Sequence, residues 1–508
     1  MSIYILLLIL IPLITAFLIP LVDLILSNNF RRFLVLISAI TELSISLFIL
    51  IFNIDPLIKG DLLLNYHLGG WLPPLGINLA MDGLALIFST LISVAIFLIM
   101  IYSIGFIGHH EGKYYVLLFL VLGAMQGVIL TGDIFNLYVF IELLTVTSAP
   151  LVAFNRNKKG TEAAIKYMFY GVIGGLFFFI GVILIYFNLG TLNMAEISNH
   201  FTEINYQMQL LIISIFLLSL LIKLGIYPFH FWLSKAHSAC PGSISALLSG
   251  VLLKVYIYVF IRTFWFIIDY SVLQSVGIDK FIIYLTLLSC LLGHIFALQA
   301  DDIKKMLAYS TIGHIGMIIA VLALNTSTGF YGGILHVISH LLMKSTLFLG
   351  VGYLLHFTQS HQIKDFDGVA YKNNKIFISF IIAALGMIGL PPIIGFFSKW
   401  YILLAFLEVG NYFGAVVVIL GSLTAVVYYL RYVAHGYRLM EPEDNLEITN
   451  PLTKSFYREK AVNIIVYVFT FLVVSTGLFY RVFHLPITAI VNLIMNPENY
   501  IKLVLGGG

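Results

Sequence analysis

Apolar segments about twenty residues long follow one another along almost the whole sequence, and this feature decides what the chain can fold into. A hydrocarbon core about 30 Å thick is crossed by a helix of roughly 20 apolar residues. Because that core holds no water, backbone polar groups there must bond within their own segment, which favours helices. Hydrophobic residues make up 60% of the 508 residues, and charged residues only 10%. The sequence therefore predicts an all-α polytopic membrane protein.

About fourteen such segments can be placed as predicted spans. They cover residues 3–26, 33–54, 79–104, 114–131, 133–153, 164–188, 209–230, 242–265, 279–299, 306–325, 330–356, 376–403, 409–433 and 462–483. The first lacks a basic flank and a cleavage site of small residues, so it is predicted to be a retained helix. Pro486 and Pro497 interrupt the tail over 485–505, which favours an interfacial segment over a fifteenth span.

Lysine and arginine concentrate in every second predicted loop, and cytoplasmic loops are the ones that carry such an excess. The odd-numbered connections hold Arg31, Arg32, Lys113, Arg156, Lys158, Lys159, Lys235, Lys304, Lys305, Lys364, Lys372, Lys375, Arg438, Lys454, Arg458 and Lys460. The even-numbered connections and the tail hold little beyond Lys59, Lys280, Arg481 and Lys502. We therefore expect an even number of spans in the plasma membrane of a prokaryote, with both termini on the non-cytoplasmic side.

The sequence offers no motif for redox or hydrolytic chemistry. The longest polar stretch runs only from about Gly436 to Lys460, and no phosphate-binding glycine loop occurs. Cys240 and Cys290 are far apart and form no ligand cluster, which argues against an iron–sulfur, haem or zinc site. A net charge of +3 gives no strong field for nucleic acid. We expect no cofactor and no bound metal, and any energy for transport must come from outside this chain.

Several ionisable side chains fall inside the predicted spans, where each costs about 2.5–3.5 kcal/mol on insertion scales. The clearest are Glu142, Lys223, Lys254, Lys344 and Lys399. Glu42, Arg262 and Arg431 are further candidates, although both arginines lie near span ends and can snorkel. A lone buried lysine can be a structural ion pair. A row of lysines with a glutamate partner can instead pass a proton stepwise, because lysine, unlike arginine, can give up its proton when desolvated.

The eleventh span carries His336, His340 and Lys344 at spacings of four residues, so one helix face holds all three. Such a stack indicates a hydrated proton relay. Zinc binding by the two histidines is the alternative, but Lys344 would repel the cation and no third ligand is evident. His314 and His294 in the neighbouring spans can extend the relay or simply hydrogen-bond within the bundle.

Spans seven and twelve both contain proline and glycine inside an apolar run, at Pro228 and at Pro391–Pro392. Proline removes a backbone donor, so both helices are predicted to break at membrane depth, near Lys223 and Lys399. Simple kinks are the alternative. Because the two spans are five apart, they suggest inverted five-helix repeats over spans 4–8 and 9–13 with two half-channels. The expected units are 1–110, 111–268, 269–435 and 436–508.

The stretches 228–237, 245–246 and 302–310, together with Lys254 and His314, resemble the antiporter-like subunits shared by NADH:quinone oxidoreductase, Mrp-type cation/proton antiporters and membrane-bound hydrogenases. The resemblance covers about residues 70–435; Ser234 departs from it, because the family commonly has proline there. It implies that Glu142 pairs with Lys223, that Lys399 is the exit residue, and that the connecting residues are Lys254, His336, His340 and Lys344.

The resemblance also implies a subtype and a setting. Members of this family carry no redox centre and work with other membrane subunits in larger complexes. The chain stops soon after span fourteen, without a long lateral helix, and has Lys399 where the middle subunit of the NADH enzyme is expected to have glutamate. It therefore looks closest to the D-type Mrp subunit or its counterpart in a hydrogenase-like complex.

The predicted function is that of an ion-translocating subunit in such a complex, moving protons with or without exchange for Na⁺. Lysine and histidine favour protons, while Na⁺ would need oxygen ligands from carbonyls, serine and threonine. Two other readings fit the same pattern. One is a stand-alone secondary transporter of an organic solute, and the other is a non-conducting scaffold whose buried charges are structural pairs.

Overall fold

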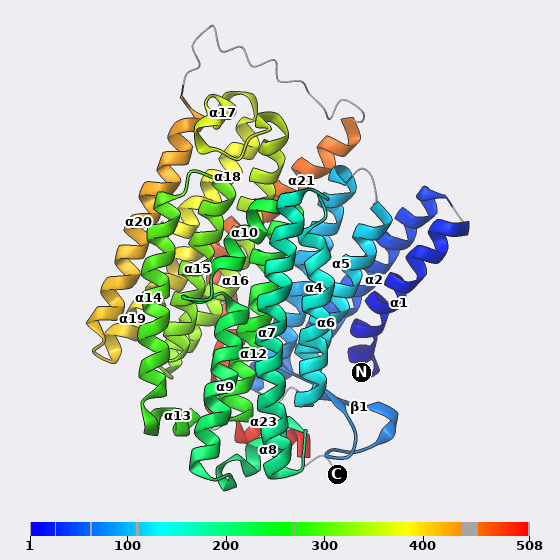
Figure 1. Ribbon diagram of the computed structural model, residues 1–508, viewed down its shortest axis with the longest axis vertical. Helices are drawn as coiled ribbons and strands as arrows, with labels where there is room; N and C mark the ends of the chain where they lie inside the picture. The colour runs from blue at the N-terminus through cyan, green and yellow to red at the C-terminus, as the bar shows by residue number, and fades with distance from the viewer. Residues whose placement is uncertain are drawn as a thin grey trace.

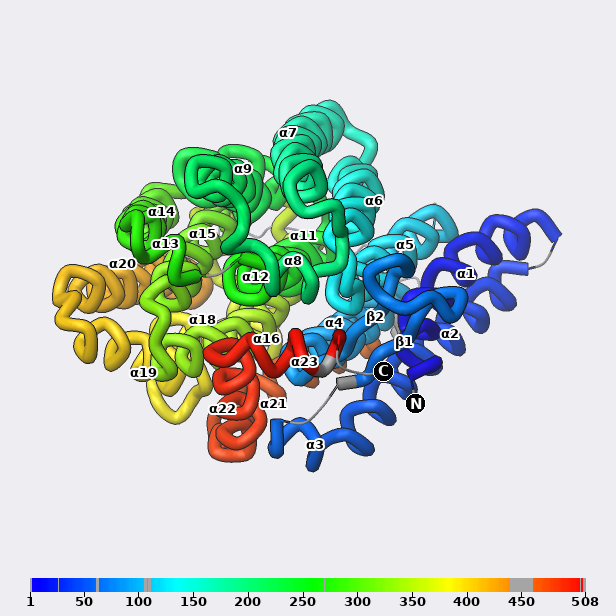
Figure 2. The backbone as a smooth tube through the Cα atoms, turned by 90° about the horizontal axis from the view of Figure 1, so that it is seen from below, coloured from blue at the N-terminus to red at the C-terminus, as the bar shows by residue number. Residues whose placement is uncertain are grey.

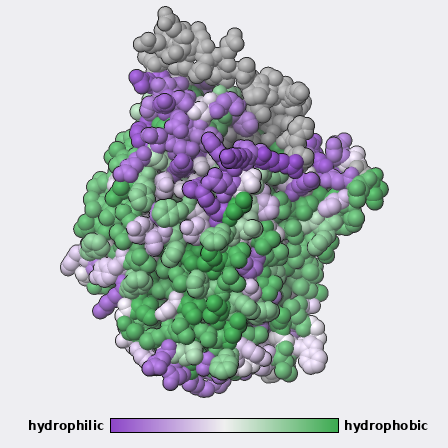
Figure 3. Space-filling view, in the orientation of Figure 1, coloured by the Kyte–Doolittle hydropathy of each residue, from purple (hydrophilic) through white to green (hydrophobic). Residues whose placement is uncertain are grey.

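The computed structural model describes residues 2–25, 27–60, 63–107, 111–268, 270–438 and 456–505. Within these ranges, thirteen helices are long and apolar enough to cross a membrane. A broad hydrophobic belt crosses the visible face of the molecule, and hydrophilic residues gather at the upper and lower ends of the molecule (Figure 3). The prediction of an all-α polytopic membrane protein is confirmed.

The spanning helices agree with the predicted segments to within several residues. They are α1 (Ile3–Ile25), α2 (Asn28–Phe52), α4 (Gly83–Phe106), α5 (Glu111–Leu130), α6 (Ile134–Val152), α7 (Lys158–Leu189), α9 (Tyr206–Leu224), the helix from Gly242 to Ile267, α14 (Ile278–Gln299), α15 (Ile303–Leu322), α16 (Ser327–Thr358), α20 (Tyr412–Gly436) and α21 (Phe456–Leu478). α7 and α16 are longer than predicted, at 32 residues each. That length corresponds to about 48 Å, so they exceed the hydrocarbon core.

The remaining predicted span is the twelfth, over residues 376–403, and it is broken. α18 (Asn374–Ile388) and α19 (Ile394–Glu408) are each too short to cross alone, and they lie one above the other in Figure 1. Counted together they give the predicted total of fourteen. Span seven is broken as predicted as well: α9 ends at Gly225, whose φ is 65°, and α10 (Phe231–Ala239) begins after the turn.

The span from Gly242 to Ile267 is not a regular α-helix, which the sequence did not predict. It consists of α11 (Gly242–Ala246), the π-helical η3 (Leu247–Leu252), α12 (Leu253–Ile261) and the π-helical η4 (Arg262–Ile267). This span and α16 are completely buried over their most apolar 18 residues. Both lie near the centre of the bundle, between α1 and α2 on one side and α19 and α20 on the other (Figure 2).

A two-stranded hairpin is a second feature that the helical periodicity did not predict. β1 (Leu63–His67) pairs antiparallel with β2 (Asn78–Asp82), with Leu63 opposite Asp82. The predicted third span started at residue 79, but the helix α4 begins only at Gly83. Asp82 is the reason, because its side chain accepts a hydrogen bond from Ala85 N and so caps the helix.

The remaining elements are short connections. They are α3 (Ile54–Lys59), α8 (Met194–His200), α13 (Tyr270–Val276), α17 (Val369–Lys372), α22 (His484–Met495) and α23 (Glu498–Leu505), with 3-10 turns at Leu68–Gly70, Phe201–Glu203, Ile363–Phe366 and Tyr480–Phe483. In the predicted interfacial tail, α22 and α23 are separated near Pro497, and α23 lies across the lower end of the bundle (Figure 2).

The start of α1 and the end of α23 lie toward the same end of the bundle, and α17 lies at the other end (Figure 1). An even number of spans requires this arrangement of the termini. The predicted polar stretch between Gly436 and Lys460 falls largely outside the described residues, including Lys454, and so does residue 110, where the first predicted unit ends.

Candidate ion-translocation path

A buried ion pair lies where span seven breaks. Lys223, in the last turn of α9, donates to Glu142 Oε1 on α6 at 2.9 Å and to Thr145 Oγ1 at 2.9 Å. The Lys223 side chain is 2% exposed and the Glu142 side chain is 22% exposed. Removing one member of a buried pair leaves an uncompensated charge, which is strongly unfavourable. Loss of either side chain would therefore leave the other without its charge partner.

Two glycines of α7 make room for this pair. A methyl group at Gly175 would lie 1.7 Å from Glu142 Oε1, and one at Gly174 would lie 3.1 Å from Lys223 Cγ. The carboxylate can therefore occupy its position only because residue 175 has no side chain.

We expect Gly175→Ala to push the Glu142 carboxylate away from Lys223 and to slow ion transport severalfold without unfolding the protein. The measurement is proton uptake into sealed vesicles that contain the assembled protein. Gly350→Ala on α16 is the matched control, because its methyl group would meet only Ile376 Cγ2, at an ordinary 3.8 Å. Unchanged transport in the Gly175 variant would contradict a role for the close Glu142–Lys223 contact.

Lys254 is the next lysine along the bundle and follows directly after the π-helical η3. Its ammonium donates to the carbonyl of Ser249 at 2.6 Å and to His340 Nδ1 at 2.6 Å. Ser249 lies inside η3, and π-helical turns are frequent at functional sites. The irregular turn thus holds Lys254 against α16, where the sequence predicted its partner histidines.

Four buried histidines continue from Lys254 toward α19; we call His294, His314, His336 and His340 the histidine cluster. The rings of His340 and His314 are 5.3 Å apart, and His314 Nδ1 lies 3.0 Å from His336 Nε2. His336 Nδ1 lies 2.9 Å from Ser398 Oγ. His294 packs its ring 5.2 Å from that of His314. The cluster connects α14, α15 and α16 with the start of α19.

The contacts of the histidine cluster bear on the alternative prediction that His336 and His340 bind zinc. Both ring nitrogens of His336 already face a partner, and Nδ1 of His340 faces Lys254. Within the described ranges, no group of three or more His, Cys, Asp or Glu residues is arranged to hold a metal ion. The histidine contacts suit proton transfer between neighbours, because imidazole can donate at one nitrogen and accept at the other.

Lys399 lies at the break in span twelve. Its ammonium donates to the carbonyls of Met387 and Ile388, at 2.7 and 3.2 Å, and to Ser422 Oγ at 2.9 Å. Those carbonyls end α18 and have no partner within the helix. At the other break, Trp232 Nε1 donates to the carbonyl of Ile222 at 3.1 Å. Both breaks thus have side chains that satisfy the freed backbone groups.

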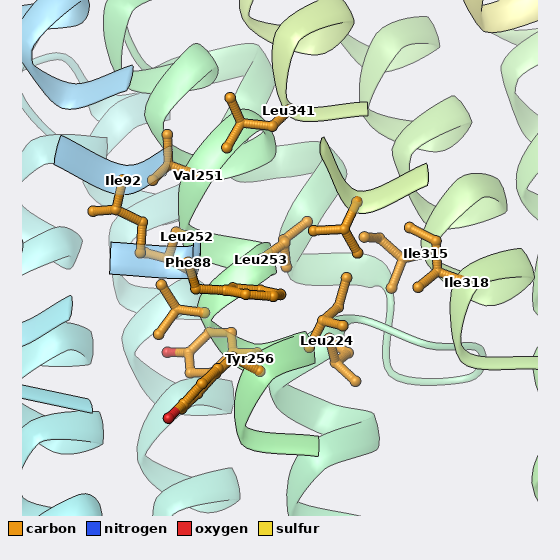
Figure 4. Packing of buried hydrophobic residues seen from close by; sticks show 14 of the residues in the cluster. Phe88, Ile92, Leu224, Val251, Leu252, Leu253, Tyr256, Ile315, Ile318 and Leu341 are labelled. Atoms are coloured by element: carbon orange, nitrogen blue, oxygen red, sulfur yellow. The ribbon is translucent and has the colours of Figure 1, made fainter. Parts of the chain in front are cut away.

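Two parts of the predicted proton relay are arranged differently from what the sequence suggested. Lys344 shares the face of His336 and His340, but its ammonium turns to α15, where it donates to the carbonyl of Leu307 at 2.8 Å and to Ser310 Oγ. Leu224 and Leu253, which adjoin the two other lysines in the sequence, lie with Tyr256 among packed buried residues (Figure 4). Lys223 bonds to Glu142 and Thr145, whereas Lys254 bonds to Ser249 and His340. Lys223 and Lys254 therefore belong to two separate hydrogen-bonded groups.

Among the further candidates, Arg262 does not snorkel as expected. It is buried, pairs with Asp82 Oδ2 at 2.5 Å, and donates from Nε to Tyr258 at 2.8 Å. The prediction was wrong because Asp82, at the end of β2, supplies a charge partner inside the bundle. Glu42 is buried beside Gln126 at 3.3 Å. Arg431 is partly exposed and donates to two backbone carbonyls, those of Leu298 and Ala300.

The fold and these contacts define the class of protein: a polytopic, ion-translocating membrane subunit with buried lysines and histidines in its interior. The family described as "NADH:quinone oxidoreductase/Mrp antiporter, TM" matches residues 131–424, which is more than half of the chain. The chain belongs to this family.

Two relatives illustrate the range of the family. NADH-quinone oxidoreductase subunit N of Desulforudis audaxviator is 32% identical over 398 residues, which cover 76% of this chain and 78% of that protein. The putative antiporter subunit mnhD2 of Staphylococcus aureus is 32% identical over 437 residues, covering 85% of this chain and 86% of that protein.

Solved structures agree with this assignment. The structure of a membrane-bound sulfane sulfur reductase, an archaeal respiratory membrane complex, contains a chain that is 28% identical, covers 99% of this chain and 100% of its own length, and has a TM-score of 0.89. A chain of the Mrp complex from Dietzia sp. DQ12-45-1b is 22% identical over 99% of both chains, with a TM-score of 0.85, and supports the fold alone. These homologues are parts of multi-subunit membrane complexes.

Proposed function

We propose that this chain moves protons across the membrane within a multi-subunit complex, by a path that starts at the Glu142–Lys223 pair, passes Lys254 and the histidine cluster, and ends at Lys399. One observation carries the proposal: Lys254, His340, His314, His336 and Ser398 form a buried series in which neighbours are hydrogen-bonded or have their rings within 5.3 Å. A proton can be handed along such a series with small side-chain rotations and a few waters.

Glu142 sets the state of the first lysine in this mechanism. While the carboxylate stays 2.9 Å from the Lys223 ammonium, it holds that lysine charged. When a partner subunit draws the carboxylate away, Lys223 releases its proton toward Lys254. Because Lys223 and Lys254 belong to separate hydrogen-bonded groups, water has to enter between them for the transfer to occur, which couples transport to a conformational change.

We place Lys344 on a side branch of the proposed proton path. Its ammonium bonds to Leu307 and Ser310 instead of to His340. A rotation of its long side chain would bring it back to the face of α16 that carries His340. We infer that Lys344 exchanges protons with the series during the cycle and does not hold one permanently in it.

The membrane orientation follows from loop charge. The lysine-rich connections predict that the end carrying α17 faces the cytoplasm of a prokaryotic cell and that both termini face outward. Because the two breaks are five spans apart, we also propose that they belong to two inverted five-helix units, each supplying one half-channel.

The host is a complex of the antiporter or respiratory type, because the relatives include an antiporter subunit and an oxidoreductase subunit. The D-type Mrp assignment remains our preferred subtype. Mass spectrometry of copurifying chains tests it: hydrogenase or flavin subunits would indicate redox drive, and other antiporter subunits alone would indicate ion exchange. Proton and Na⁺ fluxes of the same vesicles then identify the ion.

We expect Ser398→Ala to slow proton transport by roughly threefold to tenfold, because it removes one hydrogen bond in the series while a water can replace the hydroxyl. The measurement is the initial rate of proton uptake into vesicles. Ser379→Ala is the control, since Ser379 is equally buried on α18 but bonds only to the backbone of Lys375. Equal rates in wild type and Ser398→Ala would remove His336–Ser398 from the path.

A further inference from the structure

A cavity of about 480 Å³ opens at the end of the bundle that leads into the 3-10 turn Ile363–Phe366 and α17, away from the proton path. Its wall is formed by the connections after α4 and α6, the turn between α10 and α11, the first turn of α15 and the last turns of α16. Cavities of this size hold small ligands or head groups.

The polar lining of this cavity is basic. Arg156, Lys304, His356 and His361 contribute to it, and no carboxylate does. Asp302 lies on the flank of the cavity, with its Oδ2 3.6 Å from His361 Nδ1. Four basic side chains around one cavity favour binding of an anion that has several acceptor oxygens.

Lys304 gives the strongest indication that an anion belongs here. The sequence placed it in a cytoplasmic loop, but the residue is only 3% exposed and lines the floor of the cavity. Its ammonium donates to the carbonyl of Cys240 at 2.5 Å, and none of the ion pairs between described residues includes it. A buried cation with only a neutral acceptor is unfavourable unless a counter-charge completes it.

The rim of the cavity differs from its floor. Arg156 is exposed, and its backbone lies in the left-handed region with φ 51°. Ile107, Phe154 and Leu355 add an apolar wall. An anionic group entering from the rim would meet the guanidinium first and the buried ammonium last, with an apolar surface beside it.

We propose that this cavity binds a phosphate group, with Arg156 at the rim and Lys304 at the floor as its charged ligands. The phosphate is that of an anionic phospholipid head group or a free phosphate ion. The apolar wall favours the lipid, because acyl chains can pack against it while the head group occupies the basic interior.

The test uses the assembled complex in nanodiscs of phosphatidylcholine with and without phosphatidylglycerol, followed by native mass spectrometry of the retained lipid. We expect phosphatidylglycerol to be retained in preference to phosphatidylcholine, and Arg156→Gln to weaken retention about tenfold, since one charge-assisted contact is lost. Lys375→Gln removes a charge from the exposed start of α18 and is the matched control. Lys304→Gln is a second variant that should also weaken retention. If Lys304→Gln does not assemble, the result for Arg156→Gln alone decides whether the cavity binds the lipid.

A parallel measurement separates the two sources of phosphate. Thermal unfolding of the complex in phosphatidylcholine alone is followed with sodium phosphate and with sodium chloride at equal ionic strength. Stabilisation by phosphate that is lost in Arg156→Gln, without selective lipid retention, would support the site with a free ion as its ligand. If neither phosphatidylglycerol nor phosphate binds, or if Arg156→Gln and Lys375→Gln behave alike, the proposal is overturned.

Discussion

Proton transport falls to the level of protein-free vesicles when either Lys223 or Lys399 is replaced by alanine, while the complex still assembles. Alanine can hold no proton, so Lys223→Ala removes the first acceptor, and Lys399→Ala removes the group that bonds to the end of α18. The measurement is the response of a pH-sensitive dye trapped in vesicles after an ion or proton gradient is applied. Copurification of the other subunits reports assembly.

Lys235→Ala is the control for this experiment. Lys235 lies on α10, just beyond the break of span seven, but it is exposed to solvent. Its loss changes the number of lysines without touching the path. Normal transport in Lys223→Ala and Lys399→Ala would favour the non-conducting scaffold, in which the buried charges serve only stability. Transport by the purified single chain would instead favour the solute transporter.

The second large effect concerns stability. Asp82→Ala leaves the buried Arg262 guanidinium without its partner at 2.5 Å, so we expect the protein to lose about 3–5 kcal/mol of stability. Thermal unfolding in detergent, with wild type as reference, measures the loss. Replacing both residues together, Asp82→Leu with Arg262→Met, should restore the part due to the ion pair, because an apolar pair needs no counter-charge, but not the part due to the α4 cap that Asp82 forms.

A surface pair serves as the control. Glu498 and Lys502 lie 3.7 Å apart on α23, with side chains 81% and 75% exposed. Glu498→Gln should leave the unfolding temperature almost unchanged, since exposed ion pairs contribute little. If Asp82→Ala were equally harmless, Arg262 would have to be neutralised by another group or by water, and the buried pair would not hold η4 to β2.

The helical architecture could be predicted because it depends on a simple solvent rule. Apolar length sets the spans, and the prolines at 228 and 391–392 mark the two breaks. The hairpin β1–β2 escaped prediction because its strands are only five residues long and β2 runs directly into the apolar segment of the third span, whose helix starts only after the cap formed by Asp82. The π-helical turns escaped it because their residues are as apolar and helical as any others.

The candidate site could be predicted in its residues but only partly in its contacts. Glu142, Lys223, Lys254 and Lys399 stand out because charge is rare at membrane depth. Ser398 and Thr145 carry no such signal, since serine and threonine are common in membrane helices and usually bond to their own backbone. The orientation of Lys344 could not be read from a spacing of four residues, because a long flexible side chain can reach a neighbouring helix from either direction.

The π-helical turn η3 sets a strict requirement on the number of residues in its span. An α-helix rotates by about 100° per residue, so every residue after the turn owes its direction to the number of residues within Leu247–Leu252. Deleting one of them would rotate Lys254, and the residues after it as far as Arg262, by more than a quarter of a turn about the helix axis. This would happen although every functional side chain would still be present. Insertions and deletions in this span should therefore be as damaging as the loss of a charge.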